Sequence, residues 1–413
     1  MAVSRHLVTL LKVALVAALM WFVFRSINFE DRLEFRVNGE VVAEQVVEIQ
    51  GHWNRNPVTF RIVGDTNGDG GTVRALEQGA VDAQGRTQNV VPGFLSYWSH
   101  MDPLLFAAGC LLYVLTVLIA GARWWWLLRV NGTDVSLLET LRFTWIGVFF
   151  NSVVPGATGG DVVKALYIMK RCPGHRVQVL VSVGVDRILG LGSLALLGAL
   201  MVLFALDRYG EIALGIWGVI VGVALLGLIA FSRRLRELVR LKALLNKLPG
   251  RLRSVLHLVD QAVFFYRDQR LVITASLLAG MCNHVLSVGC VLCLGEAIGV
   301  GMPPFEYFVL VPVINIVSAV PIGPNGLGVG EWLYGNLYAH YGAHHLQGAV
   351  ADPALAMRTR GVALSLLYRL VLTFFSGLGG LFLLFEKDRV TKADVDREVA
   401  LENQEAEHDP TSA

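Results

Sequence analysis

Residues 151–165 read NSVVPGATGGDVVKA, and residues 321–331 read PIGPNGLGVGE. Each stretch contains a proline, a glycine-rich turn and an acidic residue that opens a new apolar segment. They interrupt two runs, 138–170 and 304–340, that are otherwise apolar enough to lie in a membrane. Backbone that is not helical cannot face lipid, because its N–H and C=O groups would have no partner there. Both breaks are therefore predicted to line a cavity or to be buried in protein.

The composition of the whole chain agrees with a membrane setting. Of the 413 residues, 54% are hydrophobic and only 16% are charged, whereas a soluble domain carries about 25% charged residues. This shortage of charge excludes a soluble globule, a disordered chain and a disulfide scaffold. It leaves a polytopic helical membrane protein, and the net charge of +2 gives no reason to expect a nucleic-acid partner.

Several further segments are long enough to cross a bilayer, since about 20 apolar residues do so as a helix. The first, at 7–24, follows Arg5 and His6 and continues without a small-residue cleavage site, so it is predicted to be a retained signal anchor. An interfacial helix is predicted at 254–269. The other predicted spans are 102–121, 182–206, 212–231, 271–298 and 361–385.

Basic residues set the predicted orientation, because cytoplasmic loops carry an excess of Lys and Arg. The segment 233–253 holds eight of them and is placed in the cytoplasm. Each full span moves the chain to the other side of the membrane. The segment 138–170 must therefore enter and leave on the inner side, and 304–340 must enter and leave on the outer side. The predicted fold is an all-α polytopic protein of a bacterial-type inner (plasma) membrane. It has six full spans plus two re-entrant helical hairpins in an inverted repeat, and both termini are cytoplasmic.

Four regions follow from this topology. They are a signal-anchor span at 1–25, a β-rich extracytoplasmic insert at 26–98, a transmembrane domain at 99–386 and a charged, disordered cytoplasmic tail at 387–413. In the insert, LEFRV and EVVAEQVVEI flank Asn38-Gly39 and predict a hairpin with a type I′ turn, and VTFRIV predicts another strand.

One motif of the insert begins like a calcium-binding loop. Its residues are Asp65, Asn67, Asp69 and Gly70, but Leu76 stands where such a loop requires a bidentate glutamate. We therefore interpret it as a turn, and no metal site or cofactor is predicted. His344-His345 has no third ligand near it in the sequence, and His284 is expected to be a core histidine.

Charges inside the membrane segments mark the candidate site. Arg369 lies about 12 Å into its span at 1.5 Å per residue, where an unpaired charge costs at least about 2.5–3.5 kcal/mol. We expect it to face the interior, with Glu331, Asp161 or a substrate phosphate as its partner. The predicted substrate-binding residues are Asn151, Pro155, Gly159, Gly160, Asp161, Lys164, Asp186, Arg187, Asn315, Pro321, Gly326, Gly328, Glu331 and Arg369.

The Pro/Gly breaks give the physical reason to expect a binding site at these residues. The prolines end the first half-helix, and the second half-helix then begins inside the membrane with its free N–H groups and positive dipole end towards the cavity. Such a place suits an anion such as a lipid phosphate. Asp161 and Lys164 are three residues apart and are expected to pair. Alternatively, Asp161 and Glu331 act only as helix caps, and Asp186 and Arg187 extend to the membrane surface.

These motifs resemble the lysylphosphatidylglycerol synthase transmembrane region, also called the flippase-like or UPF0104 family. The likeness covers about 100–386 and rests on five features: GARWWWLLRVNG at 121–132, the two stretches quoted first, VDRILGL at 185–191 and Arg369. It implies an integral inner-membrane protein that moves a phospholipid between leaflets. Bifunctional members make the aminoacyl lipid with a soluble C-terminal domain, and only 27 residues follow Glu386, so aminoacyl transfer is not expected.

Three functions stay open at this stage. The leading one is a flippase or transporter that passes a polar lipid through a cavity between the hairpins, with Lys164, Arg187 and Arg369 attracting phosphate. The second is a membrane-embedded enzyme acting on a lipid head group, although HExxH and GxSxG motifs are absent from the sequence, so no enzymatic activity is expected. The third is a non-transporting scaffold whose insert at 26–98 binds an extracytoplasmic partner.

Overall fold

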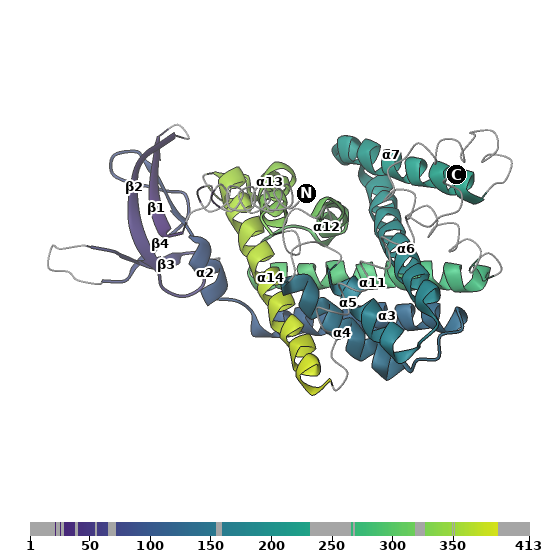
Figure 1. The fold of residues 1–413 in the computed structure, drawn as a ribbon. Coiled ribbons are helices and arrows are strands. Elements are labelled where there is room, and N and C mark those ends of the chain that lie inside the picture. Colours follow the sequence, from purple (N-terminus) through teal and green to yellow (C-terminus); the bar gives the residue numbers. More distant parts are fainter. Residues whose placement is uncertain are drawn as a thin grey trace, which may run out of the picture. The chain divides into compact units, whose positions relative to one another are not determined.

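The computed structural model describes residues 21, 25, 29–37, 40–53, 56–64, 72–153, 159–231, 266, 269–318, 327–348, 350 and 352–386 (Figure 1). The predictions made for 7–24, for 65–71, for most of 254–269 and for the tail lie outside these residues. So do three predicted site residues, Pro155, Pro321 and Gly326.

The chain divides into two compact units. The first comprises Met1–Tyr113 and Val288–Leu372, and the second comprises Val114–Ser287 and Thr373–Ala413. The helices are α2 (Phe94–Ser99), α3 (Pro103–Val130), α4 (Leu137–Val153), α5 (Gly159–Arg171), α6 (Arg176–Val202), η1 (Leu203–Ala205), α7 (Leu206–Phe231), α11 (Arg270–Ala297), α12 (Pro304–Ser318), α13 (Val329–Gly342), η3 (Ala343–Leu346) and α14 (Pro353–Phe385).

The predicted β-rich insert forms a small antiparallel sheet in the first unit (Figure 1). Its strands lie in the order β4-β3-β2-β1-β6-β5. Val37 pairs with Glu40 across β1 and β2, so these two strands form the hairpin predicted around the Asn-Gly pair. The strands are β1 (Asp31–Val37), β2 (Glu40–Ile49), β3 (Val58–Ile62), β4 (Arg74–Leu76), β5 (Ala80–Val81) and β6 (Thr87–Val91). One face buries Leu33, Val47, Ile49, Val58, Phe60 and Val90 as its core.

A buried carboxylate joins this sheet to α2. Asp31 accepts hydrogen bonds from the backbone N–H of Ile49 at 3.0 Å, from that of Gly93 at 2.7 Å and from the Ser96 hydroxyl at 2.8 Å. A carboxylate that accepts several such bonds is well compensated for its loss of solvent. The end of the sheet and the start of α2 are therefore fixed to each other.

A buried arginine of α14 joins the insert to the helices of the first unit. The Arg360 guanidinium lies over the Trp53 ring, 4.6 Å from its centroid, and donates to the Val300 carbonyl at 2.8 Å. It also donates to the Tyr97 hydroxyl at 3.4 Å. A desolvated cation over a tryptophan face is worth about 2 kcal/mol. Within this unit the insert is thus held by the transmembrane part and does not hang from a free linker.

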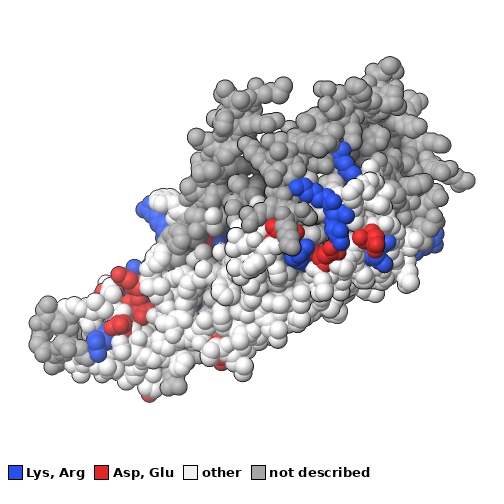
Figure 2. Space-filling model, turned by 60° about the horizontal axis from the view of Figure 1, so that its bottom comes forward, with Lys and Arg blue, Asp and Glu red and all other residues white. Residues whose placement is uncertain are grey.

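Four stretches of the described residues are long and apolar enough to cross a membrane: Pro103–Val130, Arg176–Glu211, Arg270–Ala297 and Pro353–Phe385. They contain or overlap four of the predicted spans, and the predicted span at 212–231 forms most of α7. Only 22–39% of each apolar window is buried, so most of these side chains are free to face lipid. The described part of the face drawn in Figure 2 is mostly uncharged outside a few small groups of charged side chains.

The two interrupted segments each fold as a pair of helices, α4 with α5 and α12 with α13. These helices have 17, 13, 15 and 14 residues and are therefore about 20–26 Å long, shorter than the roughly 30 Å of a hydrocarbon core. Their lengths suit re-entrant hairpins. The side from which each pair enters and the total number of spans stay predictions.

Candidate functional site

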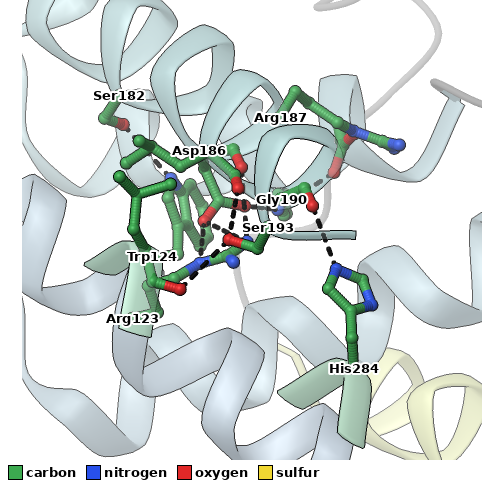
Figure 3. Close-up of polar contacts among 12 residues, drawn as sticks. Arg123, Trp124, Ser182, Asp186, Arg187, Gly190, Ser193 and His284 are labelled. Atoms are coloured by element: carbon green, nitrogen blue, oxygen red, sulfur yellow. Dashed lines mark hydrogen bonds and ion pairs between the residues drawn. The ribbon is translucent and has the colours of Figure 1, made fainter. Parts of the chain in front are cut away.

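A group of charged side chains is buried among α3, α5 and α6 of the second unit (Figure 3). Lys164 on α5 places its Nζ 2.9 Å from Asp161 Oδ1 and 3.9 Å from Asp186 Oδ2. Arg187 on α6 donates to the other oxygen of Asp161. Arg123 on α3 donates to Asp186 Oδ1 at 2.9 Å, and to its backbone carbonyl at 3.3 Å. The sequence predicted the Asp161–Lys164 pair, and it is confirmed.

Cations outnumber carboxylates in this group. Among the described residues, Arg123, Lys164 and Arg187 face Asp161 and Asp186. Four of the five are buried, whereas 42% of the Arg187 side chain is exposed. Buried ions are stable only when they are paired and hydrogen-bonded. Arg187, the most exposed of the five side chains, lies at the open side of the group.

A tryptophan fixes the lysine of this group. The Lys164 Nζ lies 4.4 Å from the centroid of the Trp124 ring, which is fully buried. The Trp124 indole donates to the Ser182 hydroxyl at 3.2 Å, and Ser182 in turn donates to the Val179 carbonyl at 2.7 Å (Figure 3). The indole is thus held with its face towards the ammonium, a favourable cation–π arrangement. Lys164 is held on three sides, by Asp161, Asp186 and Trp124.

The start of α5 is built by the glycine-rich break. The Gly160 N–H donates to the side-chain oxygen of Asn151 at 2.9 Å, which brings two predicted site residues together. A Cβ at Gly160 would collide with the Gly147 carbonyl oxygen and lie 2.7 Å from the Asn151 side chain. Only glycine therefore lets α4 and α5 approach here. Asp161 follows directly, and the bonds described for its carboxylate run to Lys164 and Arg187 rather than to the helix end.

The second candidate group lies in the first unit. Glu331 on α13 is fully buried, and its Oε1 accepts a hydrogen bond from Arg369 Nε on α14. Its Oε2 accepts from the backbone N–H of Gly328 at 2.7 Å, and Gly328 has a φ of +84°, which favours glycine. Glu331 is therefore the helix cap that the sequence allowed and also the partner of Arg369. Asn315 is partly buried near the end of α12.

The two helix pairs share more than their breaks. Asp161 and Glu331 are each the third residue of the second half-helix, and each pairs with an arginine of the next long helix, 26 and 38 residues later. Glu139 and Glu306 are each the third residue of the first half-helix. They pair with Arg171 and His345, at the far end of the same hairpin.

Sequence reasoning missed Arg123 and Trp124 as site residues. The predicted span ended at 121, and Arg123 therefore lay outside it, whereas α3 continues to Val130 and places Arg123 inside the helix. An arginine next to three tryptophans was the available signal. The Nε2 of His284 lies 3.0 Å from the Gly190 carbonyl oxygen, as expected of a core histidine (Figure 3).

Long apolar helices with uncharged outer surfaces and ion pairs buried among them define an integral helical membrane protein. A family model described as the lysylphosphatidylglycerol synthase TM region matches residues 91–380, and the chain belongs to this family. A UPF0104 membrane protein of Pyrococcus horikoshii is 35% identical to it over 140 residues, which cover 33% of this chain and 41% of that protein. The chain thus matches less than half the length of this curated relative. No solved structure matches the chain.

Proposed function

We propose that the chain is a membrane lipid transporter that carries a phosphate-bearing polar lipid between the two leaflets. The observation that supports this most directly is the gathering of three cations, Arg123, Lys164 and Arg187, around Asp161 and Asp186, with Arg187 partly exposed. It stands at the start of α5, where the positive end of the helix dipole also favours an anion. The membership of the chain in a lipid-related membrane family agrees with this proposal.

In this proposal Arg187 meets the head group first. Its side chain is 42% exposed, compared with 10% for Lys164 and 7% for Arg123. A phosphate can replace Asp161 as the partner of Arg187. Asp161 then keeps its ion pair with Lys164, so no buried ion is left unpaired. The Arg123–Asp186 pair keeps α3 and α6 in place meanwhile. In the first unit, Glu331 and Arg369 form a second buried polar pair, which we propose also takes part in transport.

Lipid movement in proteoliposomes tests the proposal. The purified protein is reconstituted with a fluorescent phospholipid, and the fraction of probe that reaches the outer leaflet is followed with a quencher added outside. Arg187→Gln removes a charge-assisted hydrogen bond worth about 1.5–3 kcal/mol, so movement should be slowed about tenfold or more. Arg369→Ala and Glu331→Gln should slow it as well.

The matched control is Arg129→Gln. Arg129 lies 2.5 Å from Asp134 in an exposed ion pair at the end of α3, outside the group, and its loss should leave the rate unchanged. If Arg187→Gln, Arg369→Ala and Glu331→Gln all move lipid as fast as the unmodified protein, the proposed site is wrong.

Lipid chemistry separates transport from catalysis. We propose that the chain makes and breaks no covalent bond. Mass spectra of the same proteoliposomes should then contain the lipids that were put in and no others, while their distribution between leaflets changes. A new covalent lipid species would instead favour an enzyme that acts on the head group.

A further inference from the structure

We propose that Glu306, His344 and His345 form a binding site for a divalent transition metal ion of the Zn²⁺ class. The site lies at the open end of the second helix pair, where α12 begins and where η3 follows α13. The inference does not depend on lipid transport, because it concerns a different group of residues.

Three ligand-type side chains converge here. The Nε2 of His345 lies 2.8 Å from Glu306 Oε1, although the two residues are 39 positions apart in the chain. His344 precedes His345 in η3, and the centroids of their rings are 3.7 Å apart. One ligand atom from each of the three side chains lies within 4.8 Å of the other two. The sequence alone placed no third ligand near the histidine pair, and folding provides one.

The donor set suits zinc better than calcium or magnesium. Two imidazole nitrogens and one carboxylate oxygen are a common three-residue set for Zn²⁺, which binds them at about 2.0–2.2 Å. Ligands on a tetrahedron of that size are about 3.3–3.5 Å apart. The present spread, from 2.8 Å to at most 4.8 Å, therefore requires shifts of about 1 Å or less at each side chain. Calcium and magnesium prefer sets made of oxygen.

A plain hydrogen bond explains less of this arrangement than a metal does. Glu306 is only 3% exposed, and a buried carboxylate is stable only when it is paired or hydrogen-bonded. Its hydrogen bond with His345 involves one of the two histidines. A dication accounts for both histidines and offsets the carboxylate charge, because metal binding stabilises the folded arrangement that brings its ligands together.

The position indicates what the metal does. It would link the first turn of α12 to η3, the turn that follows α13. The start of α12 and the end of α13 would then be held together. In the first helix pair the same position holds the Glu139–Arg171 ion pair at 2.8 Å, whose arginine is 62% exposed. A metal bridge is much firmer than an exposed ion pair.

Cobalt titration of the full-length protein tests the site. The protein is stripped of metal with a chelator in detergent micelles and titrated with Co²⁺, whose visible absorption reports the number and kind of its ligands. We expect one saturable equivalent per chain, with a spectrum of nitrogen and oxygen ligands, and full displacement by Zn²⁺. Absence of saturable binding to the unmodified protein would overturn the proposal, as would thiolate-to-metal absorption, which would place the ion at cysteines.

Variants assign the ligands. His344→Ala, His345→Ala and Glu306→Gln should each lose the saturable Co²⁺ signal, whereas His340→Ala should keep it. His340 is exposed on α13 five residues before His345 and lies outside the three-residue group. Binding retained in both His344→Ala and His345→Ala would contradict the assignment. Thermal unfolding of each metal-free variant, compared with the metal-free parent, separates loss of a ligand from loss of the fold.

Discussion

The helix pairs α4–α5 and α12–α13 are built on one plan but have different surroundings. Each begins its second half-helix with a buried acid that pairs with an arginine of the following long helix. In the first pair a lysine, a second aspartate and a second arginine are added around that acid. In the second pair, Tyr307, Tyr334 and Tyr338 pack nearby edge to face or tilted. The acid–arginine pair is therefore common to both helix pairs, and the added charges distinguish the first pair from the second.

The largest effect should come from breaking the shared element where it is most buried. Arg369→Ala leaves the fully buried Glu331 carboxylate without its cation, which should lower the free energy of unfolding by about 3–5 kcal/mol. The measurement is the thermal midpoint of folded protein recovered from detergent after heating.

The double variant Arg369→Ala with Glu331→Gln is the control. It removes both charges and keeps an amide oxygen that can accept from the Gly328 N–H, so it should recover much of the loss. If the double variant were as unstable as Arg369→Ala, the buried carboxylate would not be the cause.

The sequence predicted a good part of this plan, for identifiable reasons. Alternating residues and an Asn-Gly pair indicated the β1–β2 hairpin, and long apolar runs indicated α3, α6, α11 and α14. A charge deep in an apolar run requires a partner, which is why the Glu331–Arg369 pair was among the expected ones. Such local or energetic rules can be applied without knowing the fold.

Other parts could not be predicted, because they depend on which distant residues the fold brings together. Arg123 and Asp186 are 63 residues apart, and Glu306 and His345 are 39 apart. The end of α3 was also not predicted: Arg123 lies outside the predicted span at 102–121 but inside the helix. The boundaries of apolar helices and the register between helices are set by packing, and hydropathy alone does not report them.

The second prediction tests the starts of the two second half-helices. Gly160 and Gly330 occupy the same position in α5 and α13, but a Cβ at Gly160 would collide with α4, whereas at Gly330 its nearest atoms are 3.7 Å away. Gly160→Ala should destabilise by about 1–3 kcal/mol, and Gly330→Ala should stay within about 0.5 kcal/mol of the parent. Equal effects at the two positions would mean that the α4–α5 approach is not as close as described.

The third prediction compares the aromatic residues beside the two acids. Trp124→Phe loses the hydrogen bond to Ser182 and weakens the contact with Lys164, and should lower stability by about 1–2 kcal/mol. Tyr334→Phe should have little effect, because the buried Tyr334 hydroxyl makes no hydrogen bond among the described residues. Both are measured as thermal midpoints. A larger loss for Tyr334→Phe than for Trp124→Phe would reverse the assigned roles.

The smallest effect is expected at the open end of the first pair. Arg171→Gln breaks the ion pair with Glu139, in which the arginine side chain is 62% exposed and the glutamate side chain 26% exposed. Water already solvates the arginine and salt screens the pair, so stability should change by less than about 1 kcal/mol and by even less at high ionic strength. Thermal midpoints at low and high salt measure both. A loss as large as that of Arg369→Ala would mean that exposed and buried positions of the shared plan contribute equally, contrary to what their burial predicts.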